Sequence, residues 1–122
     1  MEKRFDGKIM VNGLLFLKTK MAVCNMLVYI DVSRSKCELY GIRQLDQLVD
    51  RCNQRCVDRY EIKDLMEMLE TGIYDVIIVR DVLELTANTN DLEALTNEIM
   101  SMSIGIFELS TGLYRYNCYE GY

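Results

Sequence analysis

The sequence contains no histidine, no proline and no tryptophan. Imidazole-based acid–base catalysis and histidine metal sites are therefore excluded. Positive charge is also scarce, because 14 lysines and arginines stand against 19 acidic residues and leave a net charge of −5 at pH 7. A large non-specific nucleic-acid surface needs a basic face, so this balance argues against one.

A long apolar run is missing as well, since no stretch reaches the roughly 18 residues that span a bilayer. The charged N-terminal residues do not resemble a signal peptide, and we expect a cytoplasmic protein with no membrane contact. The cysteines are odd in number and irregularly spaced, which favours reduced thiols used in packing: Cys24, Cys37, Cys52, Cys56 and Cys118. Half a zinc site at Cys52 and Cys56 is the less favoured interpretation.

At 122 residues, half of them hydrophobic, the chain is long enough for one domain with a real core. In its first half, the Asn12-Gly13 dipeptide between two apolar runs predicts a hairpin over residues 8–19. The apolar run 26–32 predicts a buried strand, and helical spacing of apolar residues predicts a helix over 41–53.

The second half has clearer boundaries. A capping-box pair, Asp58 with Glu61, predicts a helix that ends at Gly72, and a buried strand over 74–80 follows it. Asn90 with Glu93 repeats the capping-box spacing and predicts another helix, before a strand over 104–109 and a turn over 110–112. The tail adds a final strand.

Helices that alternate with continuous apolar strands predict an α/β fold with a mainly parallel sheet flanked by helices. We expect residues 1–22 to form an N-terminal extension, 23–115 the domain and 116–122 a tail. In such sheets chemistry lies just past the carboxyl ends of strands, where Ser33 would fall. The ordinary interpretation of a serine after a strand is a helix cap or a turn.

Ser33 and several segments that follow it resemble, in order, the motifs of one protein family. Residues 29–33, Tyr-Ile-Asp-Val-Ser, resemble the Tyr-x-Arg-x-Ser opening of serine site-specific recombinases, the resolvase/invertase family. Residues 43–48 are similar to the Arg-Gln-Leu helix of that family, and Arg59 stands where its Arg-Pro-Gly segment opens a helix. Residues 72–79 and 80–88 follow its Gly-x-x-Asp-Val strand and the motif after it, and 101–113 its last strand.

The resemblance implies a resolvase-like catalytic domain in which a serine attacks a DNA phosphodiester while arginines clamp the phosphate. Carried over residue by residue, it implies catalytic roles for Ser33, Arg59 and Asp81. Three clamping arginines are replaced in this sequence, by Asp31, Glu84 and Ala87. Since guanidinium forks meet the spread charge of a phosphate transition state, the exchange should disfavour DNA cleavage.

Two further parts of the family pattern are not found. The chain has only residues 52–58 where the family has a strand and an acidic loop, so we expect the N-terminal hairpin to cover an open sheet edge. We also expect no dimerisation helix and no C-terminal DNA-binding domain after residue 115.

The first functional hypothesis is a degenerate recombinase domain, a pseudoenzyme without cofactor or metal. It would meet DNA through an intact recombinase partner, or form a homo-oligomer. The second is an active fragment whose missing arginines are supplied by Arg34, Arg80 or a partner subunit. A third is a magnesium site that handles phosphate through Asp31, Asp81 and Glu84. The last is an interaction module that uses the tyrosines of the tail: Tyr114, Tyr116, Tyr119 and Tyr122.

Overall fold

A computed structural model describes residues 10–53 and 56–115. The chain forms one five-stranded sheet in the order β2-β1-β3-β4-β5. Its elements are β1 (Val11–Lys18), α1 (Val23–Leu39), β2 (Ile42–Asp50), α2 (Tyr60–Leu69), β3 (Val76–Val79), the short 3₁₀ helix η1 (Val82–Glu84), α3 (Thr89–Ser101), β4 (Gly105–Glu108) and β5 (Leu113–Arg115). All neighbouring strands are parallel except β4 and β5, so the predicted α/β class with a mainly parallel sheet is confirmed.

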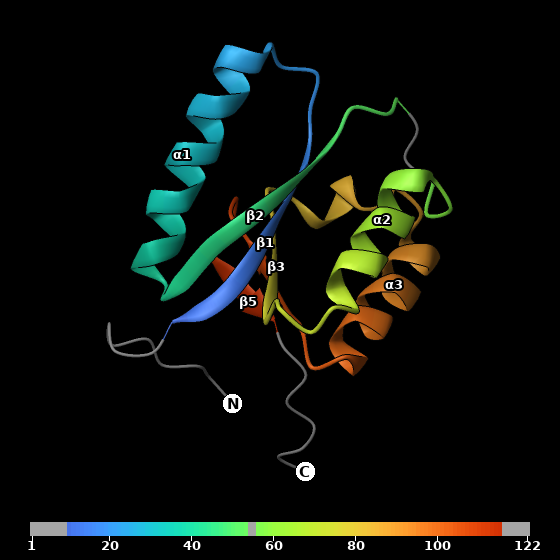
Figure 1. Cartoon of the computed structure of the whole chain (residues 1–122). Helices are drawn as coiled ribbons and strands as arrows, with labels where there is room; N and C mark the ends of the chain where they lie inside the picture. Colours follow the sequence, from blue (N-terminus) through green and yellow to red (C-terminus); the bar gives the residue numbers. More distant parts are fainter. Residues whose placement is uncertain (1–9, 54–55, 116–122) are drawn as a thin grey trace.

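Helices cover both faces of the sheet, with α1 alone on one side and α2 and α3 together on the other (Figure 1). The alternation of side chains along β1 explains the two layers. Leu14 and Phe16 face the core that α2 and α3 close, whereas Leu15 and Leu17 face the core beneath α1. Because both faces of β1 are covered, its residues 14–17 form an unbroken apolar run.

The predicted hairpin over residues 8–19 is wrong, because its described part, 10–19, contains one continuous strand. Asn12 and Gly13 lie inside β1 rather than at a turn. A Cβ at Gly13 would lie 2.7 Å from Ile78 Cδ1 and 2.8 Å from Ile42 Cγ2, so glycine serves here to let β2 and β3 approach. The expected edge-covering hairpin is also wrong, since β1 is an interior strand and β2 forms the edge.

Two further predictions in the first half are wrong. Residues 26–32 belong to the helix α1, and residues 42–50 form the strand β2 instead of a helix. The sheet therefore includes residues assigned above to an N-terminal extension. α1 was misread because apolar residues occur around most of its circumference, and such a run lacks the polar face that marks a surface helix.

The second half follows the prediction. The helix α2, the strand β3, the helix α3 and the strand β4 lie where expected, and Gly72 has the predicted positive φ of 79°. The final strand is confirmed for residues 113–115, and the rest of the predicted tail lies outside the described residues. The two capping boxes are wrong in detail: α2 begins after Arg59 with no side-chain cap, and α3 is capped by Asn88.

No helix among the described residues is long and apolar enough to cross a membrane.

Candidate functional site

The carboxyl ends of β1, β2 and β3 lie next to one another at one end of the sheet, and they bring five charged side chains together. We call this group the strand-end cluster, and its members are Lys18, Asp50, Arg59, Arg80 and Glu84. Ligands of open α/β sheets bind at the carboxyl ends of the strands. This end of the sheet therefore provides the candidate site of the fold.

Arg59 lies at the centre of the cluster, and its side chain is only 2 % exposed. Its Nε donates to Asp50 Oδ2 at 2.9 Å. Nη1 donates to the carbonyl oxygens of Cys56 and Leu85, both at 2.7 Å, and Nη2 donates to the carbonyl of Glu84 at 2.8 Å. The guanidinium thus joins the end of β2, the start of α2 and η1, and it faces the interior of the protein instead of a substrate.

Asp50 is fully buried and accepts from several groups at once. Arg59 binds Oδ2, Lys18 Nζ lies 3.4 Å from the same oxygen, and the backbone N–H of Cys52 donates to Oδ1 at 2.8 Å. Because a buried carboxylate needs such partners to remain charged, the Asp50–Arg59 pair is a structural ion pair.

Arg80 and Glu84 form a second pair at the edge. Arg80 Nε donates to Glu84 Oε2 at 2.5 Å, and Arg80 Nη2 donates to the carbonyl of Lys18 at 2.8 Å. The other oxygen of Glu84 accepts from the backbone N–H of Lys18 at 3.3 Å. Glu84 is a position where the family resemblance expects an arginine, and here its carboxylate neutralises the neighbouring cation.

Thr19 is the hydroxyl residue that follows the strand β1. It lies in the wall of a cavity of about 450 Å³, which is also lined by Lys18, Lys20, Cys52 and Arg80. Its side chain is buried, and Oγ1 accepts from the backbone N–H of Met21 at 3.0 Å. Thr19 is not among the residues predicted from the sequence, although the sequence carries a signal for it: a hydroxyl between two lysines directly after an apolar run.

Ser33 lies in the middle of α1, and not after a strand. It is 2 % exposed, and its Oγ donates to Gln44 Oε1 at 2.6 Å, across the contact between α1 and β2. Gln44 in turn donates to the carbonyl of Ile30 at 3.1 Å. Ser33 also borders a smaller cavity of about 230 Å³, whose lining includes Lys36 and Arg80. Its hydroxyl therefore fixes α1 to β2.

The structure separates the other residues singled out from the sequence. Asp31 lies on the exposed side of α1 and pairs with Arg34 at 2.7 Å. Asp81 caps η1 by accepting from the backbone N–H of Leu83 at 2.8 Å, and Ala87 is exposed after η1. Glu84 lies beside Arg59 and one turn from Asp81, whereas Asp31 lies on the exposed side of α1, so the three carboxylates of the magnesium hypothesis are not assembled at one site.

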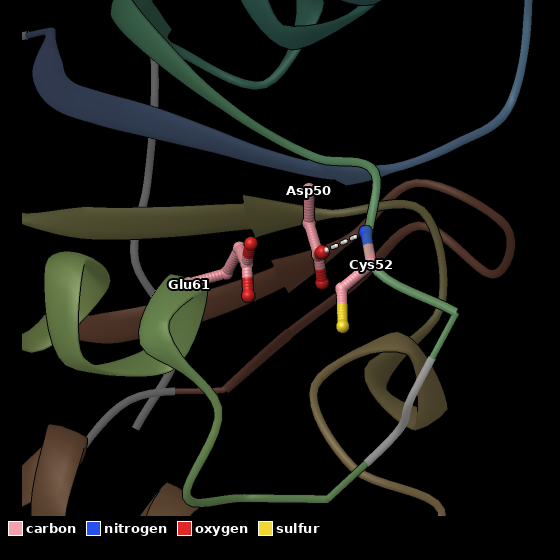
Figure 2. Close-up of side chains that lie close together, drawn as sticks. All are labelled: Asp50, Cys52 and Glu61. Carbon is pink, nitrogen blue, oxygen red and sulfur yellow. Dashed lines mark hydrogen bonds between the residues drawn. The ribbon is translucent and has the colours of Figure 1, made fainter.

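A different group of possible metal ligands lies beside Arg59. Figure 2 shows Asp50, Cys52 and Glu61 pointing toward one another, with ligand atoms within 4.8 Å of one another. A cation there would have to share the Asp50 carboxylate with the guanidinium of Arg59 and the ammonium of Lys18. We therefore assign no metal to this group.

Burial changes the chemistry of two other side chains near α1. It raises the pKa of the Cys37 thiol to about 11, and it also raises the pKa of Tyr29, over whose ring the Arg80 guanidinium lies at 5.8 Å. Both groups remain protonated at neutral pH. Neither therefore supplies an anionic nucleophile to the cavities at the strand ends.

Comparison with known proteins places this geometry in a fold family. No protein-family model matches the sequence, and no curated protein is detectably similar to it. The structure is similar to the N-terminal catalytic domain of TP901-1 integrase, with a TM-score of 0.70 and 15% identity over 84% of this chain and 80% of that one. It is also similar to the C-terminal catalytic domain of ISC1926 TnpA, an IS607-like serine recombinase (TM-score 0.68, 14% identity, covering 81% of this chain and 69% of that one).

A third similar structure is a resolvase family site-specific recombinase from Streptococcus pneumoniae, with a TM-score of 0.61 and 10% identity over 85% of this chain and 75% of that one. The chain therefore has the fold of serine recombinase catalytic domains, as the sequence resemblance implied.

Proposed function

We propose that this chain is a degenerate serine-recombinase domain, which takes part in site-specific recombination by association and not by cutting DNA. The fold supports the link to recombinases, because the similar structures are the catalytic domain of an integrase, the catalytic domain of an IS607-like serine recombinase and a resolvase family site-specific recombinase. The partner would be an intact recombinase subunit or a second copy of this chain.

The observation that carries the proposal is the internal pairing of both arginines of the strand-end cluster. Arg59 donates its hydrogen bonds to Asp50 and to backbone carbonyl oxygens, and Arg80 Nε donates to Glu84. A phosphate transition state is stabilised by preorganised donors aimed at its oxygens, and each missing donor costs roughly 3–4 kcal/mol of activation free energy. Donors that already bind protein oxygens cannot supply this stabilisation without breaking the fold around them.

A second candidate function follows from Thr19. Its hydroxyl occupies the end of an interior strand, in a cavity lined by Lys18, Lys20 and Arg80. A phosphate-transfer reaction at this edge would therefore use Thr19 as the nucleophile in place of Ser33. The hydrogen bond from Met21 and the burial of the side chain weigh against it.

The test is a search for a covalent protein–DNA adduct. The full chain is incubated with supercoiled DNA, quenched with denaturant and analysed for protein that migrates with DNA, beside an active serine recombinase with its own site as positive control. We expect no adduct. An adduct that disappears in Thr19→Val but persists in Ser33→Ala would establish the second candidate, and the reverse pattern would restore the serine chemistry of the family.

A further inference from the structure

The helix α1 presents an apolar surface to solvent. Its outward side, which we call the outer α1 face, is formed by residues four or three apart: Cys24, Val28, Val32, Ser35 and Leu39. Val28 is 62 % exposed, Val32 57 % and Leu39 82 %. Val23 and Leu27 extend the apolar surface along one side.

This surface is unusual for a helix that covers a sheet. The inner side of α1 already packs on the sheet through residues such as Ile30 and Cys37. No charged residue occurs in the first two turns, residues 23–30. Within the described part of the chain α1 is alone on its side of the sheet, and no other element covers it (Figure 1).

The exposed parts of the five aliphatic side chains correspond to about three whole residues, on the order of 500 Å² per copy. Two such faces packed together would bury about 1,000 Å² of apolar area. With the polar side chains at their border, the interface reaches the lower end of the roughly 1,200–2,000 Å² that specific interfaces bury.

We infer that a second copy of this chain covers the outer α1 face, with the two α1 helices antiparallel about a twofold axis. The inference deepens the association half of the proposed function, on which it rests, by naming the interface. A twofold interface uses the same patch on both copies, and one stripe on a single helix, apolar except for Ser35, satisfies this condition.

Charge complementarity fixes the register. Asp31 and Arg34 lie on one border of the outer α1 face and pair within the chain at 2.7 Å. With the axis midway between them, each Asp31 carboxylate also faces Arg34 of the partner subunit, so four charges alternate around the axis. A parallel arrangement would instead place the charged pairs of the two copies on opposite borders of the interface, where they could not complement each other.

The same register interleaves the apolar side chains. At about 1.5 Å rise per residue, Val28 lies about 7 Å from the axis and Cys24 about 13 Å on the same side. The partner's Leu39 lies about 10 Å from the axis, and therefore falls between the two. Val32, close to the axis, meets the partner's Val32. The stripe thus packs into its own copy without a clash of large side chains.

The experiment measures the oligomeric state of the full chain by sedimentation velocity over a range of concentrations, with a reductant present because Cys24 is exposed. We expect a reversible dimer. Val28→Lys and Val32→Lys should each raise the dissociation constant of the dimer about a hundredfold. The twofold symmetry places each substitution in the interface twice, once from each copy. The matched control is Ile73→Lys, since Ile73 is 52 % exposed but lies outside α1, and it should leave the dissociation constant unchanged.

A charge-reversal pair tests the register. Asp31→Arg should weaken the dimer by at least tenfold, and the double change Asp31→Arg with Arg34→Asp should restore it. Arg34 is half-buried and the other positions are exposed, so circular dichroism is expected to show an unchanged fold in every variant.

A wild-type chain that stays monomeric would overturn the inference, and the outer α1 face would then be covered by another protein or by further residues of this chain. A dimer that tolerates Val28→Lys would overturn the interface while leaving self-association in place. Neither result depends on DNA cleavage, so failure here is distinguishable from an unexpected adduct in the cleavage test.

Discussion

Replacing Arg59 with methionine is expected to destabilise the fold by about 3–5 kcal/mol, because it leaves the buried carboxylate of Asp50 without its main counterion. Methionine keeps much of the side-chain volume but donates no hydrogen bond. The carbonyl oxygens of Glu84 and Leu85, which Arg59 now satisfies at 2.8 and 2.7 Å, would lose those partners in a buried place.

The loss can be read as a change in melting temperature. For a chain of 122 residues, each kcal/mol corresponds to roughly 3–6 °C, so Arg59→Met should lower the melting temperature by roughly 10–30 °C. Chemical denaturation with two probes would give the free energy directly. A matched control is Arg34→Met, because Arg34 makes an exposed ion pair with Asp31, and its loss should cost below about 1 kcal/mol.

A double-mutant cycle separates the ion pair from the other contacts of Arg59. Asp50→Asn removes the charge that Arg59→Met strands, so the double variant should be more stable than the sum of the two single losses indicates. The measurements should use protein concentrations low enough to exclude association. If Arg59→Met lowers the free energy of unfolding no more than the Arg34→Met control does, the Arg59 guanidinium does not stabilise the fold. It would then be available to a substrate.

The remaining predictions concern the titration of two buried groups. Cys37, buried and with a pKa of about 11, should resist alkylation by iodoacetamide at pH 8, whereas exposed Cys24 should react quickly; peptide mass spectrometry measures both rates, and equal rates would contradict the burial of Cys37. Burial and the hydrogen bond to Asp46 raise the pKa of Tyr74 to about 12. The unfolded chain then releases this proton first, so stability should fall as the pH rises from about 10 toward 12. Denaturation at pH 9 and 11 should show a smaller fall in Tyr74→Phe than in the wild type, and identical falls would refute the assignment.

The second half of the fold could be predicted from the sequence because its local signals agree with its burial. α2 and α3 each place one apolar stripe on the sheet, and β3 is buried on both faces. Gly72 is needed at the end of α2 because its φ is positive. In this half the pattern of apolar residues reports directly on the core.

The first half could not be predicted because its apolar residues are not all in the core. The exposed Val28 and Val32 fill the side of α1 that polar residues normally occupy, and so conceal the helical period. The edge strand β2 has the opposite problem. Its exposed Leu45 and half-buried Leu48 happen to recur at helical spacing, although one side of the strand has no neighbour in the sheet.

Where the sequence places a candidate site depends on which segments are taken as strands. The rule that a reactive hydroxyl follows a buried strand selects Thr19 once β1 is known, but it selected Ser33 when 26–32 was read as the strand. Arg59 and Glu84 are adjacent in the structure, and the elements around them lie where the sequence predicts them. Their internal contacts depend on Asp50 and Lys18, which adjoin them only in three dimensions.

The pairing of Arg80 with Glu84 also constrains how this protein could evolve. An arginine introduced at position 84 would stand against Arg80, and a repulsion would replace a 2.5 Å attraction. A cation at position 84 is therefore compatible with this structure only if position 80 gives up its own positive charge. The two positions are bound to change together, so a more cationic pocket at this end of the sheet requires two coordinated substitutions.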